Sequence, residues 1–202
     1  MKAIRFGPNG SIPGFEVNPE GGQAIIFVQE WWGVTDVVKQ QAVLFSQSAG
    51  QFRVLIPDLY KGVVGVDREE ASHLLTSLDY HLAVEEIGHA ARYLLSTGST
   101  KVGITGSCMG GALSFAAAQF CPEIAHAAAL CGCPMSGLLL CQSMKAAGCN
   151  MELFLYEDTP HSFLNALTSE GEAFLVEFGY QVPPTRQVWL CFHRLVEFFK
   201  IM

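Results

Sequence analysis

Short, continuous apolar runs alternate along this chain with longer stretches whose apolar positions recur every three to four residues. The apolar runs predict buried strands at residues 23–30, 52–57, 102–105, 124–130 and 151–156. The periodic stretches predict helices at residues 35–49, 67–78, 79–96, 109–118, 138–147 and 185–200. Strands that alternate with helices predict a single three-layer α/β domain over residues 1–202, with a mostly parallel central sheet.

Charge and composition exclude several function classes. The 202 residues carry a formal net charge of −7 and no basic run, which argues against nucleic acid as a partner. No apolar stretch approaches the ~18 residues of a membrane span. The start, Met1-Lys-Ala-Ile-Arg-Phe-Gly, lacks the apolar core of a secretion signal, so we expect a cytoplasmic protein.

The seven cysteines raise the question of disulfides or a metal. Their odd number and irregular spacing argue against a disulfide framework. Cys131 and Cys133 are separated by one residue, not the two of a zinc-binding pair, and no second pair follows. We therefore expect reduced thiols and no metal site.

The stretch from Lys101 to Ala118 carries the strongest chemical signal. A short apolar strand leads into Gly106-Ser-Cys108-Met-Gly110, and an alanine-rich helix follows. This is the nucleophile-elbow pattern with cysteine in place of serine. The sharp turn lifts the sulfur out of the sheet and places it at a helix N-terminus, which favours the thiolate.

Two further reactive groups fall at predicted strand ends. Glu30 follows the first long strand, and His161 lies on a loop directly after the predicted strand 151–156. In parallel sheets, sites gather at the carboxyl ends of the strands. Nucleophile first and histidine late is the α/β-hydrolase order, so we expect His161 to be the base that takes the proton of Cys108.

With these pieces in place, the chain resembles the dienelactone hydrolase (carboxymethylenebutenolidase) family of α/β-hydrolases over nearly its whole length. Four motifs carry the resemblance: Val28-Gln-Glu-Trp-Trp-Gly-Val34, Pro57-Asp-Leu-Tyr60, Gly103-Ile-Thr-Gly-Ser-Cys-Met-Gly-Gly-Ala112 and His161-Ser-Phe163. The family consists of cofactor-free hydrolases with a Cys-His-Asp triad, acting on small esters or lactones.

The resemblance also implies roles for individual residues. It maps the nucleophile to Cys108, the base to His161, and a glutamate that takes part in thiol activation to Glu30. It implies an oxyanion hole formed by the backbone N–H groups of Trp31 and Met109. Family members that act on dienelactone hold its carboxylate with arginines, where this chain has Lys61 and Asn165. Lys61 remains a candidate substrate-binding residue, but dienelactone itself is not the expected substrate.

The triad acid has no counterpart in the expected region. No aspartate or glutamate occurs from Ile124 through Met151, so one strand–helix unit and its acid-bearing loop are expected to be missing before the last strand. The strand 151–156 is then predicted to pair directly with strand 124–130. Asp158 is the nearby acid that could replace the lost one, and its position predicts exposure to solvent.

Three other functions compete with an active ester hydrolase. The missing acid favours a catalytically dead relative that binds a small molecule or a partner. A class I amidotransferase also uses an elbow cysteine, but it expects glutamine two residues after the second glycine, and none is present. A redox sensor built on Cys108 is the third, since an exposed thiolate is readily oxidised.

Overall fold

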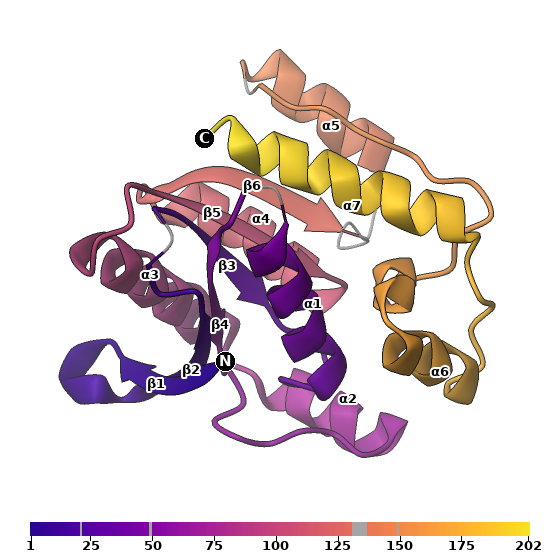
Figure 1. The fold of residues 1–202 in the computed structure, drawn as a ribbon, viewed down its shortest axis with the longest axis horizontal. Helices are drawn as coiled ribbons and strands as arrows, with labels where there is room; N and C mark the ends of the chain where they lie inside the picture. The colour runs from indigo at the N-terminus through magenta and orange to yellow at the C-terminus, as the bar shows by residue number, and fades with distance from the viewer. Residues whose placement is uncertain (21, 49, 131–136, 149) are drawn as a thin grey trace.

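One mixed sheet forms the centre of the molecule. The computed structural model describes the whole chain except residues 21, 49, 131–136 and 149 (Figure 1). The strand order is β1-β2-β4-β3-β5-β6. The first two strands are antiparallel, and β4, β3, β5 and β6 run parallel. The strands are β1 (Lys2–Phe6), β2 (Ile12–Val17), β3 (Gln23–Val28), β4 (Arg53–Pro57), β5 (Lys101–Ser107) and β6 (Ile124–Leu130).

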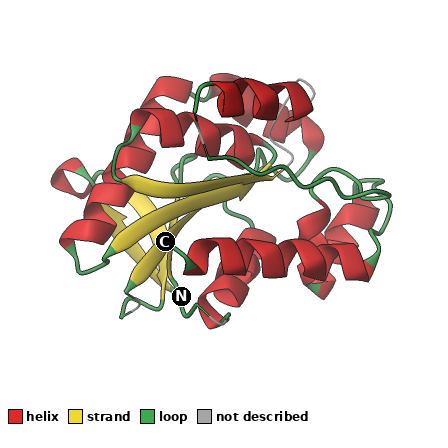
Figure 2. Ribbon diagram, turned by 90° about the horizontal axis from the view of Figure 1, so that it is seen from above, coloured by secondary structure: helices red, strands yellow, loops and turns green. Residues whose placement is uncertain are grey.

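Helices cover both faces of this sheet, giving the predicted three layers (Figure 2). The helices are η1 (Pro8–Gly10), α1 (Asp36–Gln47), α2 (Arg68–Ser77), α3 (Tyr80–Ser96), α4 (Met109–Phe120), α5 (Gly137–Ala146), η2 (Phe163–Leu167), α6 (Ser169–Glu177) and α7 (Thr185–Lys200). The predicted helices at 35–49, 67–78, 79–96, 138–147 and 185–200 are confirmed within two residues at each end.

Alternating side chains of the central strands build two separate cores. In β3, Ile26 and Val28 pack with α3 and α4, whereas Ile25 and Phe27 pack with α1, η2 and α7. Successive residues of a strand point to opposite faces, so a continuous apolar run fits a strand that is buried on both sides.

Side-chain caps fix where the first long helices begin. The side chain of Thr35 accepts a hydrogen bond from the N–H of Val38, and Asp67 and Asp79 cap α2 and α3 in the same way. Each cap satisfies a helix N–H that has no partner within the helix. The helix α1 ends at Gln47, two residues before the predicted end at residue 49.

The pattern of the sequence did not reveal the N-terminal hairpin. β1 and β2 pair antiparallel, and Pro13 and Gly14 inside β2 mask its alternation. The hairpin is joined to the parallel part by a buried ion pair in which Arg53 of β4 donates to Glu16 Oε1 at 2.8 Å from Nε. Arg53 also donates to Ser99 Oγ at 3.2 Å.

The predicted strand at 151–156 is wrong. Residues 150–156 form no strand, and the segment lies along α7 (Figure 1). The guanidinium of Arg194 lies 4.5 Å from the ring centre of Phe154 and donates to the hydroxyl of Tyr156 at 3.2 Å. Tyr156 also contacts the ring of Phe163. These contacts pack the aromatic side chains against α7 and η2. Tertiary contacts of this kind override the β-propensity of the segment.

Within the described part of the chain, β6 is therefore the last strand of the sheet. The expected pairing of residues 151–156 with β6 does not occur. Asp158 is exposed, as predicted. The Cys131–Cys133 spacing discussed above lies outside the described residues.

Candidate active site

Cys108 sits at the tip of a strained turn between β5 and α4. Its backbone adopts φ 57° and ψ −123°, a region that residues with side chains rarely occupy. Its N–H donates to the carbonyl of Leu130 at the end of β6. The side chain is half-buried and stands at the N-terminus of a twelve-residue helix. The predicted strand–turn–helix is thus present.

Two glycines allow the turn to lie tightly against β3. A Cβ on Gly110 would come within 2.5 Å of the carbonyl oxygen of Val28. A Cβ on Gly106 would come within 2.7 Å of the backbone of Gly110. Both distances are shorter than real Cβ contacts, so only glycine fits at either position. The close approach holds the end of β3 directly beside the start of α4.

We expect Gly110→Ala to lower the free energy of unfolding by about 1–3 kcal/mol, because the new methyl group overlaps the β3 backbone. The same overlap should tilt the turn and slow iodoacetamide labelling of Cys108. Urea denaturation and timed labelling measure the two effects. Gly22→Ala is the matched control, since a Cβ there meets no heavy atom within 4 Å. A Gly110→Ala variant as stable and as reactive as the parent would contradict this account of the turn.

The two proposed oxyanion donors lie where the end of β3 approaches the start of α4. Met109 is the first residue of α4, so its N–H has no acceptor within the helix. Trp31 lies just past the end of β3, and within the described residues its N–H has no backbone acceptor. Two N–H groups of this kind suit the negative oxygen of a tetrahedral intermediate.

Tyr60 is a site residue to which the sequence analysis gave no role. It is buried, and its hydroxyl donates to the sulfur of Met109 at 3.3 Å. Burial raises the pKa of Tyr60 to about 12, and the negative charge of the nearby Cys108 thiolate adds to the rise. Tyr60 therefore stays a neutral donor beside the thiol. The only signal in the sequence was its place in the Pro57–Tyr60 motif.

Glu30 is buried at the end of β3, with 6% of its surface exposed. Asn165 Nδ2 donates to its Oε2 at 3.3 Å, and within the described residues its Oε1 has no partner. Burial raises the pKa of Glu30, and hydrogen bonds from Ser162 and Asn165 partly oppose the rise. Glu30 is therefore not a solvated carboxylate at the strand end.

Glu30→Gln is expected to stabilise the protein near neutral pH. Because the folded-state pKa of Glu30 is raised above the usual 4.5, the folded protein holds a proton that the unfolded chain releases. Stability is therefore lost as pH rises from 4.5 through the folded-state pKa, by about 1.4 kcal/mol for each unit between the two values. Glutamine carries no charge and avoids this loss.

Urea denaturation at several pH values tests the sign. The stability advantage of Glu30→Gln should vanish below pH 4.5 and grow above it. Glu152→Gln, at an exposed position, is the matched control and should follow the parent protein. A parallel pH dependence for Glu30→Gln and the parent would show that Glu30 is not the buried group responsible.

His161 lies on the loop between residues 156 and 163, and its side chain is exposed. The surrounding loop still removes enough water to lower the pKa of His161, so the ring is a neutral base at neutral pH. The next residue, Ser162, has φ 58°, and Asn165, four residues after His161, donates from Nδ2 to Glu30 Oε2. The structure thus brings the segment that carries His161 to Glu30, whereas the contact of His161 with Cys108 stays a prediction.

Lys61 forms an ion pair with another residue of the chain, Glu86. Its Nζ lies 2.5 Å from both carboxylate oxygens of Glu86 in α3. Glu86 is buried, and the Lys61 side chain is 45% exposed. A cation held in this way is less available to a substrate carboxylate. The predicted substrate-binding role of Lys61 remains a prediction.

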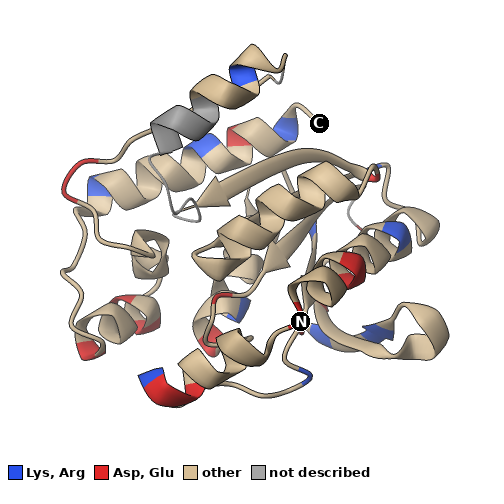
Figure 3. Cartoon of the chain, turned by 180° about the vertical axis from the view of Figure 1, so that it is seen from behind, with Lys and Arg blue, Asp and Glu red and all other residues tan. Residues whose placement is uncertain are grey.

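Aromatic residues line the loop that follows β3. Trp32 contacts the rings of Trp31, Phe174 and Phe178. The N–H of Gly65 donates to the carbonyl of Trp32, which connects this loop to the segment between Tyr60 and α2. Acidic side chains gather on the neighbouring helices α2 and α6 (Figure 3).

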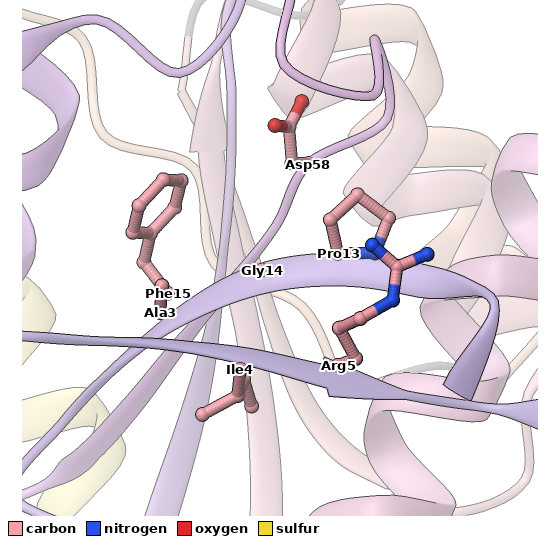
Figure 4. Close-up of a pocket in the computed structure, with 7 residues that line it drawn as sticks. All are labelled: Ala3, Ile4, Arg5, Pro13, Gly14, Phe15 and Asp58. Atoms are coloured by element: carbon pink, nitrogen blue, oxygen red, sulfur yellow. The ribbon is translucent and has the colours of Figure 1, made fainter.

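A pocket of about 280 Å³ lies elsewhere, over the β1–β2 hairpin (Figure 4). Its walls include Arg5, Pro13, Phe15 and Asp58. Arg5 is already bonded to the carbonyls of Gly10 and Ser11 in the hairpin turn. None of the predicted catalytic residues lines this pocket, so it is separate from the candidate active site.

Comparison with known proteins decides the family. The model of the Dienelactone hydrolase family matches residues 12–139. This chain belongs to that family. The match includes β3 with Glu30, the turn with Cys108 and the helix α4, but it ends before His161. Family members are hydrolases that act on ester or lactone bonds, which establishes the class of reaction for the family.

Two bacterial relatives cover most of the chain. Protein usf of Aquifex pyrophilus is 28% identical over 80% of this chain and 72% of its own length. A protein of Aquifex aeolicus (strain VF5) named "Putative carboxymethylenebutenolidase" is 26% identical with the same coverage.

The fold also has a solved counterpart. The dienelactone hydrolase-like promiscuous phosphotriesterase P91, from metagenomic libraries, superimposes with a TM-score of 0.73. It covers 99% of this chain and 97% of its own, at 14% sequence identity. The TM-score establishes the shared α/β-hydrolase fold, and an identity this low supports nothing finer. In the part of the chain that the structure describes, no helix has the length and apolar character needed to cross a membrane.

Proposed function

We propose that this chain is a cysteine-dependent hydrolase of small, uncharged esters or lactones. The observation that carries the proposal is the turn at Cys108, whose positive φ and glycine neighbours present the thiol at the N-terminus of α4. A helix N-terminus favours the thiolate, which is the nucleophilic form. Membership of the dienelactone hydrolase family supports the reaction class.

The proposed first step is acyl transfer to sulfur. The Cys108 thiolate attacks the carbonyl carbon of the ester, and the carbonyl oxygen becomes an oxyanion bound by the N–H groups of Trp31 and Met109. The C–O bond then breaks. His161 gives the proton taken from the thiol to the departing alkoxide, so an alcohol leaves and a thioester remains on Cys108.

The proposed second step is hydrolysis of the thioester. His161 removes a proton from water, and the resulting hydroxide attacks the thioester carbonyl. The C–S bond breaks, Cys108 leaves as thiolate, and the acid product is released. Glu30 is proposed to take part in activating the thiol at the start of the cycle, as the family resemblance implies.

We further propose that the chain works without the triad aspartate. No acid occurs from Ile124 through Met151, and Asp158 is exposed. In a serine triad, loss of the orienting acid costs roughly 10⁴ in turnover. A cysteine that is already partly ionised depends less on a histidine base, so we expect weak but measurable turnover.

The preference for uncharged substrates rests on charge near the site. Lys61 is paired with Glu86, and the neutral Asn165 stands where family members that act on dienelactone have an arginine. The acidic helix α6, which packs against Trp32 through Phe174, adds negative potential beside the loop that follows β3. A substrate carboxylate would meet repulsion that Lys61, already paired with Glu86, would offset only weakly.

Two esters with the same leaving group test this preference. p-Nitrophenyl acetate should be hydrolysed with a kcat/KM at least about tenfold higher than a p-nitrophenyl ester that carries a carboxylate on its acyl chain. Lys61→Met should change neither value more than about twofold. A preference for the anionic ester that Lys61→Met abolishes would restore Lys61 as a substrate-binding residue.

One observation favours a second candidate, a binding protein without catalysis. Residues 150–156 form no strand, so the loop that carries His161 is not held at the edge of the sheet by a strand of its own. A histidine held loosely would be a poor partner for Cys108. Absence of turnover of p-nitrophenyl acetate, with retained binding of the acetate product or a partner, would favour this candidate.

A further inference from the structure

Three buried polar side chains form a chain of hydrogen bonds behind the candidate active site. Gln41 in α1 donates from Nε2 to Asn165 Oδ1 at 2.9 Å, and Asn165 in η2 donates from Nδ2 to Glu30 Oε2 at 3.3 Å. The exposed fractions of Gln41 and Asn165 are 4% and 2%. Buried polar groups of this kind are costly unless each is hydrogen-bonded.

A backbone carbonyl fixes which groups donate and which accept in this series of hydrogen bonds. Gln41 Nε2 also donates to the carbonyl oxygen of Leu164 at 3.0 Å. A carbonyl oxygen accepts hydrogen bonds and cannot donate, so the NH₂ end of Gln41 must face it. Asn165 must then turn its oxygen toward Gln41, and its NH₂ group is left to face Glu30. A flipped Asn165 would set its oxygen against a carboxylate oxygen.

We propose that Gln41 is a positioning residue for Glu30: it fixes the orientation of the Asn165 amide so that a donor, not an acceptor, meets the buried carboxylate. This inference rests on the proposed function for the meaning of Glu30, although the hydrogen bonds stand without it. A donor held against Glu30 favours the ionised form, which burial disfavours. Gln41 thereby favours the carboxylate form of Glu30.

The titration of Glu30 must be distinguished from the titration of neighbouring groups. Ser162 and Asn165 face it from the loop and from η2, and neither titrates. Cys108 and His161 are the titratable residues assigned to the same site. Infrared difference spectra resolve the carbonyl stretch of a protonated carboxylic acid, and the band that disappears in Glu30→Gln belongs to Glu30.

The test replaces Gln41 by methionine, which has a similar length and no donor. In Gln41→Met the Asn165 amide is free to flip, so we expect the Glu30 band to titrate at higher pH than in the parent. We expect kcat/KM for p-nitrophenyl acetate at neutral pH to fall about tenfold, mainly through kcat. In the Glu30→Gln background, Gln41→Met should add less than about twofold to the loss.

Controls separate positioning from simple loss of stability. Phe45 lies in the same helix, is buried against the rings of Phe27 and Phe192, and has no hydrogen-bonding group in its side chain. Phe45→Leu should therefore lower stability without moving the Glu30 band. If Gln41→Met does not fold, the nearly isosteric Gln41→Glu carries the same expectation, since a carboxylate turns the NH₂ of Asn165 away from Glu30.

The inference is overturned if Gln41→Met or Gln41→Glu leaves the Glu30 titration unchanged, or if the loss of activity is equally large in the Glu30→Gln background. The infrared titration needs no turnover. Its result therefore stands apart from the proposed function, which fails instead if hydrolysis does not depend on Cys108.

Discussion

Replacing Cys108 with alanine is expected to abolish ester hydrolysis, with a loss in kcat of at least about 10³-fold. Alanine keeps the backbone turn and the packing of α4 but removes the atom that attacks the carbonyl. The residual rate should equal that of the ester in buffer. Steady-state kinetics with p-nitrophenyl acetate measure the effect, and circular dichroism checks that the variant is folded.

A second cysteine on the same helix provides the matched control. Cys121 caps the C-terminus of α4, is buried, and has a thiol whose pKa is raised by burial. Cys121→Ala removes a thiol whose raised pKa favours the protonated form, at the C-terminal end of α4. It should retain full turnover at a small cost in stability. Loss of turnover in Cys121→Ala, or its retention in Cys108→Ala, would contradict the assignment of the nucleophile.

The largest expected effect on stability comes from the buried ion pair between β2 and β4. Glu16→Gln should lower the free energy of unfolding by about 3–5 kcal/mol. The Arg53 guanidinium would remain charged and buried, with neutral acceptors at Leu94, Thr97 and Ser99. A net stability of about 5–15 kcal/mol leaves little margin for such a loss.

Urea denaturation of three variants separates this effect from charge in general. The double variant Glu16→Leu with Arg53→Met should recover part of the loss, because two apolar side chains leave no buried charge unpaired. Glu197→Gln removes an exposed pair with Lys200 and should cost less than about 1 kcal/mol. Equal losses for Glu16→Gln and Glu197→Gln would show that burial does not govern the cost.

Much of the fold follows from local patterns in the sequence. The helix α7 begins at Thr185 and ends at Lys200, as its apolar spacing predicts. Aspartates at 67 and 79 mark the starts of α2 and α3 because their side chains cap the first turn. The turn at Cys108 was predictable because its glycines are required by short-range contacts.

Other features depended on long-range contacts that a local pattern cannot contain. Residues 151–156 have the composition of a strand, yet Arg194, some forty positions away, holds Phe154 and Tyr156 against α7. The partners of Glu30 come from η2 and, through Asn165, from α1. The sequence singled out Glu30 by its position at a strand end, but Gln41 and Ser162 carried no comparable signal.

Catalysis is expected to pass through a thioester on Cys108. Rapid acid quench during turnover of p-nitrophenyl acetate, followed by intact-mass and peptide mass spectrometry, observes this intermediate directly. We predict one acetyl group per chain, located on the peptide that contains Cys108 and removed by hydroxylamine. Turnover with the acetyl group on another residue, or turnover that persists in Cys108→Ala, would contradict the account.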